Sequence, residues 1–132
     1  MIRTVHFLEL DHMDDYMVSF WLDERGRQHA TLLRSLEYEP DLAPEDRPRT
    51  VFYTHERVQP AGDLLVAAEW DQNRVHLRTQ TREFVLDVSR IRQAESLALA
   101  KLILKRMNYD GSFDIVVRRG PKKAGARAKM NR

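Results

Sequence analysis

The sequence lacks several features on which common activities depend. It contains no cysteine, which excludes disulfide bonds, thiolate metal sites and cysteine nucleophiles. Its five glycines form no phosphate-binding loop, and neither a G-x-S-x-G nor an HExxH motif occurs. The longest nearly apolar stretch, LALAKLIL, is interrupted by a lysine and falls well short of the roughly 18 residues that span a bilayer. We therefore expect a cytoplasmic protein that is not an enzyme, needs no cofactor and binds no membrane.

Charge is distributed unevenly along the 132 residues, a length typical of one domain. Seven of the 22 Lys and Arg residues lie in 118–132, where no acid occurs, which leaves 15 against 20 Asp and Glu in 1–117, a net charge of −5. Lys and Arg mixed with Gly and Ala offer no apolar stripe for packing. We expect one folded domain over 1–118 and a basic disordered tail over 119–132.

Alternating apolar and polar residues dominate the first ninety positions, a pattern typical of half-buried strands. It predicts strands over 16–22 and 51–53, and a meander of three antiparallel strands over 64–88. The segment 29–38 fits either a strand or a short helix, and the strand is favoured. Four residues of one parity are expected to face the core, namely Leu64, Val66, Ala68 and Trp70.

Helical spacing occurs once, from about Ile91 to Met107, and NYDGS then ends the helix. Leu97, Leu102 and Ile103 are expected to pack on the sheet. A last short strand follows at 113–117. The predicted fold is α+β: an antiparallel meander sheet or half-barrel of six to eight short strands, covered by one C-terminal helix.

Acidic residues are concentrated in 11–46, which holds ten Asp and Glu against three Arg. An acidic surface speeds and orients association with a basic protein. The leading hypothesis is therefore a protein-binding domain whose basic partner contacts an acidic face: Asp14, Asp15, Asp23, Glu24, Glu37, Glu39 and Asp41.

Basic residues favour an alternative hypothesis, a small accessory protein that binds RNA or DNA. Arginines and a histidine alternate on one predicted strand, and the tail could contact phosphates without reading sequence. Trp70 has the parity of the core and is not expected to stack on bases. The candidate contacts for nucleic acid are Arg74, His76, Arg78, Arg82, Arg118, Arg119, Lys122, Lys123, Arg127 and Lys129.

The five histidines match no known metal-ligand spacing, so no metal site is expected. His6 and His12 lie near an acidic turn, but a strand followed by a turn would separate them. His55 and Glu56 could form an acid–base pair, yet adjacent residues of a strand point to opposite faces. A catalytic histidine–carboxylate pair therefore ranks below both binding hypotheses.

Five segments and the following helix resemble a family of bacterial immunity proteins encoded beside polymorphic toxins, the immunity protein 10 type. The segments are DDYMVSFWLDE, ATLLRSLEYEPD, VFYTHE, LLVAAEWDQNRVHLRTQ and EFVLDVSRI, so that the resemblance covers roughly 15–104. The YDGSFDIVV strand and the basic tail lie beyond the family's expected end. The resemblance implies an α+β domain that binds and blocks a toxin without catalysis.

Overall fold

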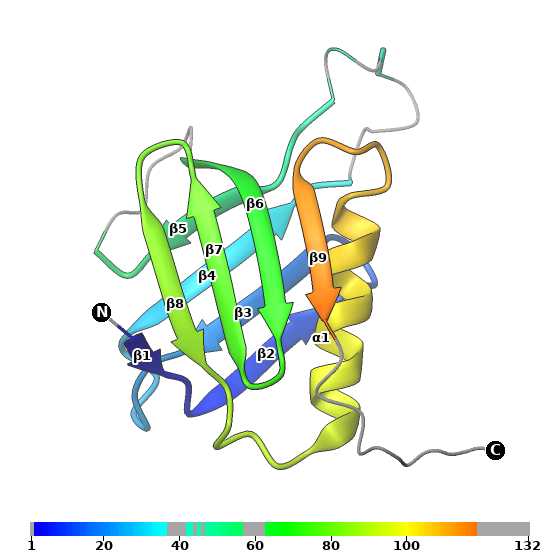
Figure 1. Cartoon of the computed structure of the whole chain (residues 1–132). Helices are drawn as coiled ribbons and strands as arrows, with labels where there is room; N and C mark the ends of the chain where they lie inside the picture. Colours follow the sequence, from blue (N-terminus) through cyan, green and yellow to red (C-terminus); the bar gives the residue numbers. More distant parts are fainter. Residues whose placement is uncertain (1, 37–41, 44, 46, 57–62, 119–132) are drawn as a thin grey trace, which may run out of the picture.

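The structure, a computed structural model, describes residues 2–36, 42–43, 45, 47–56 and 63–118. Within these residues it has nine strands and one helix, which confirms the α+β class (Figure 1). None of its helical segments is long and apolar enough to cross a membrane. The elements are β1 (Ile2–Thr4), β2 (Phe7–Asp11), β3 (Tyr16–Trp21), β4 (His29–Arg34), β5 (Val51–Thr54), β6 (Asp63–Asp71), β7 (Arg74–Thr79), β8 (Glu83–Asp87), α1 (Ala94–Met107) and β9 (Asp114–Arg118).

The strands form one curved sheet in the order β1-β8-β7-β6-β5-β4-β3-β2, with β9 added beside β6. Because the sheet bends at β6, it makes two layers that cross one another in Figure 1. We call β1, β6, β7, β8 and β9 the front layer and β2, β3, β4 and β5 the back layer. β4 is a strand, which confirms the preferred interpretation of the segment beginning at His29.

A β-bulge in β6 lies at the corner between the layers. The register with β7 shifts between Leu65 and Ala67, so that the side chains before and after the bulge have different parities. Leu65, Ala68 and Trp70 are buried, whereas Leu64 and Val66 are only half-buried. The predicted inward set was therefore right for Ala68 and Trp70 and wrong for Leu64 and Val66, because a strict period of two cannot anticipate an inserted residue.

β6, β7 and β8 pair antiparallel, which confirms the predicted meander, but two further strand pairs of the sheet are parallel. β1 pairs with β8, and β9 pairs with the second half of β6. The turn from β1 to β2 then crosses between the layers, because the Val5 N–H donates to Asp87 O at 2.8 Å and the His6 N–H donates to Trp21 O at 2.7 Å. The N-terminal segment thus links one edge of the front layer to the back layer.

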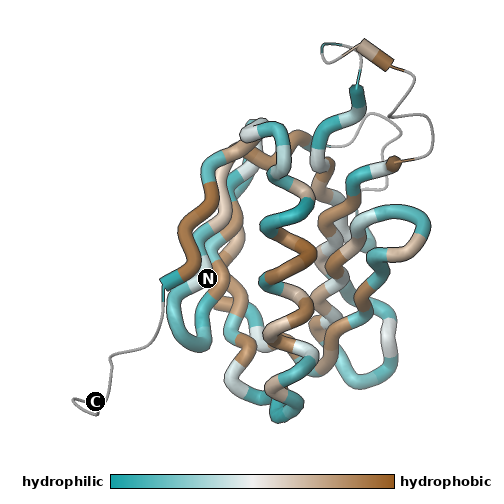
Figure 2. The backbone as a smooth tube through the Cα atoms, turned by 90° about the vertical axis from the view of Figure 1, so that its right-hand side faces the viewer, coloured by the Kyte–Doolittle hydropathy of each residue, from teal (hydrophilic) through white to brown (hydrophobic). Residues whose placement is uncertain are grey.

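The helix α1 covers the side of the curved sheet that the strands leave open. Figure 2 shows it running between two groups of strands, with hydrophilic turns at both ends of the molecule. Its buried side chains are Ala100, Ile103, Leu104 and Met107. Its N-cap is Gln93, which has extended backbone angles, so the helix begins three residues later than predicted. Leu102 is 43% exposed, and its predicted burial was wrong.

A buried arginine joins the end of β4 to the end of α1. The side chain of Arg34 is fully buried, and its Nη1 donates to Met107 O at 2.8 Å, which satisfies a carbonyl of the last helical turn. Both nitrogens of its fork bond the carboxylate of Asp110, at 2.9 and 2.7 Å. The Tyr109 ring packs on the guanidinium with its centroid 4.5 Å away. The Arg34 side chain therefore orders the connection from α1 to β9.

Truncation of Ile103 tests how the helix packs, because this side chain is fully buried. We expect Ile103→Ala to lower the free energy of unfolding by about 2–5 kcal/mol, through lost burial and the cavity it leaves. Leu102→Ala, one position earlier and exposed, is the matched control and should change it by less than about 0.5 kcal/mol. Equal effects in urea denaturation would contradict the assigned core face.

The Arg34–Asp110 pair should make the free energy of unfolding depend on pH in the acidic range. Hydrogen bonds from Arg34 lower the pKa of Asp110 from 3.8 to about 2. A lowered carboxyl pKa contributes stability above pH 4 that is lost as pH falls toward 2. Asp110→Asn should therefore destabilise the protein most at neutral pH, by about 1–3 kcal/mol, because part of the pair is exposed to solvent.

Asp114→Asn removes an exposed carboxylate in the same region and serves as the control for Asp110→Asn. The measurement is urea denaturation of the three proteins between pH 7 and pH 2. A destabilisation by Asp110→Asn that does not shrink with acid would show that the ion pair is not its origin.

Candidate functional site

The outer surfaces of the two layers differ in chemistry. Side chains on the front layer's outer surface are largely charged, whereas most of those on the back layer are aromatic or aliphatic. An antiparallel sheet with one solvated face normally alternates apolar inward and polar outward residues. The front layer follows this rule and the back layer does not, so the back layer carries the candidate site.

The site consists of the outward side chains of four adjacent strands, which we call the β2–β5 face. Residues paired across the strands place them in rows, since Phe7 lies opposite Trp21 and Trp21 opposite His29. Aliphatic side chains form a further row, because Met17 lies opposite Leu33 and Leu33 opposite Val51. The face comprises Phe7, Glu9, Asp11, Met17, Ser19, Trp21, His29, Thr31, Leu33, Val51, Tyr53 and His55.

Aromatic rings extend across all four strands of this face. Phe7 is stacked on Trp21, with centroids 5.6 Å apart and planes 13° from parallel. Trp21 contacts His29 at 5.0 Å, and His29 meets the Tyr53 ring edge-on at 5.8 Å. Such contacts stabilise a sheet by about 0.2–1 kcal/mol per pair, and they hold the rings rigidly. Phe7 is 40% exposed at the end of this row.

Small hydroxyl residues lie beneath the larger side chains of the face. The Ser19 and Thr31 hydroxyls are 2.8 Å apart, and His29 Nδ1 lies 2.9 Å from Thr31 Oγ1. Ser19 is 4% and Thr31 2% exposed, so these hydroxyls satisfy one another rather than face solvent. They hold His29 in place and are not accessible to a substrate.

Two ionisable groups of the face have shifted pKa values. Burial lowers the pKa of His29, and the neighbouring His55 lowers it further, while the charge of Glu9 acts in the opposite direction. Burial, followed by the charge of Glu9, raises the pKa of Tyr53. Both shifts favour the uncharged form of the side chain, and Glu9 and Asp11 are the carboxylates of the face. Glu9 also accepts a hydrogen bond from Trp21 Nε1 at 3.2 Å.

The structure does not bring the predicted acidic residues into one patch. Asp14 and Asp15 lie before β3, whereas Asp23 and Glu24 lie after it, about 20 Å away along a six-residue strand. Asp15 accepts a hydrogen bond from the Leu36 N–H at 3.0 Å. Glu37, Glu39 and Asp41 lie outside the described residues.

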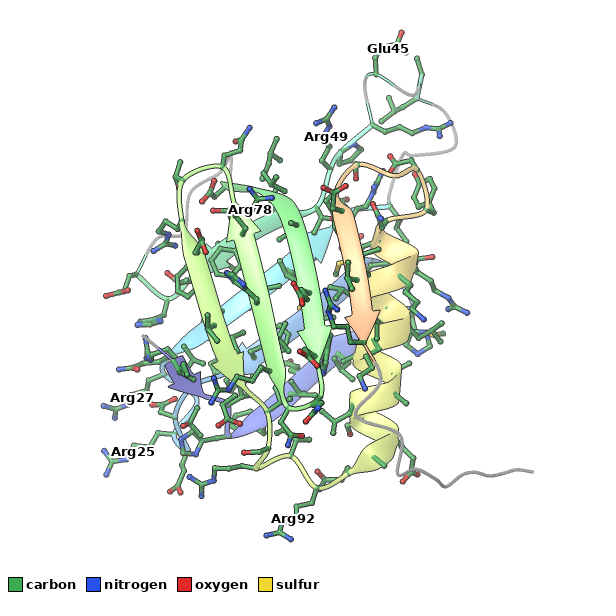
Figure 3. The ribbon with its side chains drawn as sticks, in the orientation of Figure 1. Arg25, Arg27, Glu45, Arg49, Arg78 and Arg92 are labelled. Atoms are coloured by element: carbon green, nitrogen blue, oxygen red, sulfur yellow. The ribbon has the colours of Figure 1, made fainter. Side chains whose placement is uncertain are left out.

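Asp23 has a local structural role. It accepts hydrogen bonds from the backbone N–H groups of Arg27 and Gln28, at 2.9 and 3.1 Å, and these bonds lower its pKa. It thereby shapes the turn in which Gly26 adopts a φ of +70°. Arg25 and Arg27 project outward from the same turn (Figure 3), so this end of β3 is not purely acidic.

The predicted basic stripe is present but carries balancing carboxylates. Arg74, His76 and Arg78 occupy exposed positions of β7, and Figure 3 places Arg78 toward one end of that strand. Four of their six cross-strand neighbours are carboxylates, namely Glu69, Asp71, Glu83 and Asp87, and the other two are Ala67 and Val85. His76 Nε2 lies 2.8 Å from Glu83 Oε2.

Arg82 does not extend the stripe, because its guanidinium packs over the rings of Phe84 and Phe52, with centroids 4.8 and 5.8 Å away. Arg118 lies on β9, where its Nε bonds Glu69 Oε2 at 2.8 Å. The remaining candidates, Arg119, Lys122, Lys123, Arg127 and Lys129, lie outside the described residues. The front layer is therefore a surface of mixed charge rather than a basic one.

The histidines and carboxylates of the described residues do not form a metal-ligand cluster, since no three of their side chains converge as metal ligands would. The closest histidine pairing is His29 with His55, whose Nδ1 accepts the His29 N–H at 3.2 Å. The sequence predicted neither this pairing nor the aromatic row. A usable signal was the apolar character of Met17 and Trp21, which have the outward parity of their strand.

Comparisons with known proteins give no match: neither a protein-family model, nor a curated protein, nor a solved structure is significantly similar to this chain. The resemblance to the immunity protein 10 family therefore stays a prediction from sequence.

Substitutions around His29 should move its pKa in opposite directions. Glu9→Gln removes a charge that favours the imidazolium form and should lower the His29 pKa further. His55→Gln removes a group that disfavours it and should raise the pKa. NMR titration of the imidazole Cε1–H signals measures both changes. Shifts of the same sign in the two variants would contradict the described geometry.

Proposed function

We propose that this protein is a non-catalytic, protein-binding domain, and that the β2–β5 face is its docking surface. The observation that carries the proposal is a group of aromatic and aliphatic side chains on the outside of an antiparallel sheet, of which Phe7 is exposed and the others are half-buried. Contiguous exposed apolar surface on a soluble protein marks interaction sites, whereas scattered apolar residues do not. Its Trp and Tyr side chains belong to the residue types that dominate binding energy at protein interfaces.

The charges of the face favour a basic partner. Glu9 and Asp11 lie side by side along β2, and no Lys or Arg occupies an outward position of the four strands. Asp14 is exposed in the turn that follows. A partner with an apolar centre and Lys or Arg opposite β2 would complement this surface and gain in association rate. The acidic contact is thus narrower than the sequence predicted, and it centres on β2.

An inhibitor-like or immunity-like role would use the same surface. An inhibitor that blocks a toxin needs a rigid docking surface and no reactive group, and the stacked rings over a buried hydroxyl network fit that requirement. The absence of cysteine is compatible with the reducing cytoplasm as the place of action.

Site-specific photo-crosslinking in the native cell tests the proposal. A photoreactive phenylalanine at Phe7 or Met17 should capture one protein reproducibly, because both side chains belong to the face. The same probe at His76, which is exposed on the front layer, is the control and should not capture it. Glu9→Lys together with Asp11→Lys should abolish the crosslink by charge repulsion.

Affinity measurements with the captured protein complete the test. Trp21→Ala should weaken binding by about 30-fold, as for a central interface residue worth about 2 kcal/mol. Crosslinking from Phe7 and Met17 no stronger than from His76 would refute the proposed docking surface. Capture of a second copy of this chain would show that the face mediates self-association instead of binding a different protein.

A further inference from the structure

A groove lies between α1 and β9, which run side by side in Figure 1. It encloses about 390 Å³ and shares no residue with the β2–β5 face. Lys101 and Lys105 line it from the helix, and Val117 and Arg118 line it from the strand. Gln72, in the turn between β6 and β7, also contributes to its wall.

Positive charge dominates this groove. Lys101 and Lys105 are one helical turn apart, about 6 Å along the axis, and neither forms an ion pair with a carboxylate of the described chain. Lys101 Nζ lies 5.3 Å from the centre of the Trp70 ring, a contact that positions the ammonium at the groove. Arg118 donates its Nε–H to Glu69. The guanidinium has four further N–H donors.

Apolar side chains complete the lining. Leu102 and Ala98 come from the helix, between and before the two lysines. Leu102 is 43% exposed, although a leucine in the core-facing set of this helix would be buried. The groove therefore combines cations that suit phosphates with apolar surface that suits sugars and base faces.

The sequence beyond the groove favours a long polyanion over a small one. Arg118 is both a lining residue and the first of seven Lys and Arg residues in 118–132, a segment without any acid. By contrast, the stripe on β7 has carboxylates on both neighbouring strands. The described lining of the groove, in contrast, contains no carboxylate, which favours a phosphate chain there over β7.

We infer that the α1–β9 groove binds the phosphodiester backbone of a single-stranded nucleic acid, without reading its sequence. Lys101, Lys105 and Arg118 contact phosphates, while Leu102 and Val117 contact the sugars and bases. This activity is separate from protein binding by the β2–β5 face, and either can exist without the other.

The test compares two double variants of the full chain that lose the same charge. Lys101→Gln/Lys105→Gln alters the groove, and Arg74→Gln/Arg78→Gln alters the exposed β7 stripe. Binding of a fluorescein-labelled, mixed-sequence single-stranded RNA is followed by anisotropy over a series of KCl concentrations. We expect the groove variant to bind about tenfold more weakly and its salt slope to fall by about 1.4, the value for two lost phosphate contacts. The β7 variant should lose less than about twofold, because its cations already face carboxylates.

Lys105→Gln alone serves as a second variant, because Lys105 is exposed and does not cover Trp70. It should lower the salt slope by about 0.7 without changing the melting temperature. The inference is overturned if the unaltered protein does not bind the RNA, if both double variants lose affinity equally, or if the groove variants keep the original slope. It is also overturned if polyglutamate displaces the RNA when both supply the same concentration of negative charge, since the site would then bind acidic peptides.

Discussion

The burial of one guanidinium sets the arrangement of the C-terminal half of the fold. Arg34 is carried into the interior by the inward parity of β4, and a charge there is tolerated only with matched partners. Asp110 and the carbonyl of Met107 supply them. Because these partners flank the end of α1, the same contacts fix where the helix stops and where β9 begins. The contact lies at the start of the connection that leads from α1 to β9, the two elements that line the α1–β9 groove.

The bend of the sheet separates two outer surfaces that differ in chemistry. At the β6 bulge the chain passes from the back layer to the front layer, so that each layer turns one face to the core and one outward. The front layer pairs Arg with Asp and Glu across its strands, which keeps that surface hydrated. The back layer instead stacks Phe7, Trp21 and His29 across its strands. The contrast between a solvated face and an apolar one, in one small domain, is the strongest structural argument for a docking function.

The helix contributes to both the core and the surface. The open side of the curved sheet is covered by the helix's buried residues Ile103, Leu104 and Met107. The groove beside β9 is lined by Lys101, Leu102 and Lys105. A helix with apolar residues around much of its circumference looks like a core element in sequence. Only the one-sided position of the sheet shows that Leu102 belongs to a different surface from Ile103.

The sequence by itself determined the fold class, because local periodicity follows directly from how side chains alternate on strands and recur on helices. It located β3, β4, β5, the β6–β8 meander and α1, and it placed Trp70 in the core. It also located the basic stripe on β7, since alternation is a local property. Tertiary structure alone decided which strands lie side by side, including the parallel pairs of β1 and β9. The aromatic row, the His29–His55 contact and the Arg34–Asp110 pair all join residues from separate strands or from the ends of distant elements. Their proximity depends on register, on the bulge and on the bend of the sheet, which no local pattern encodes.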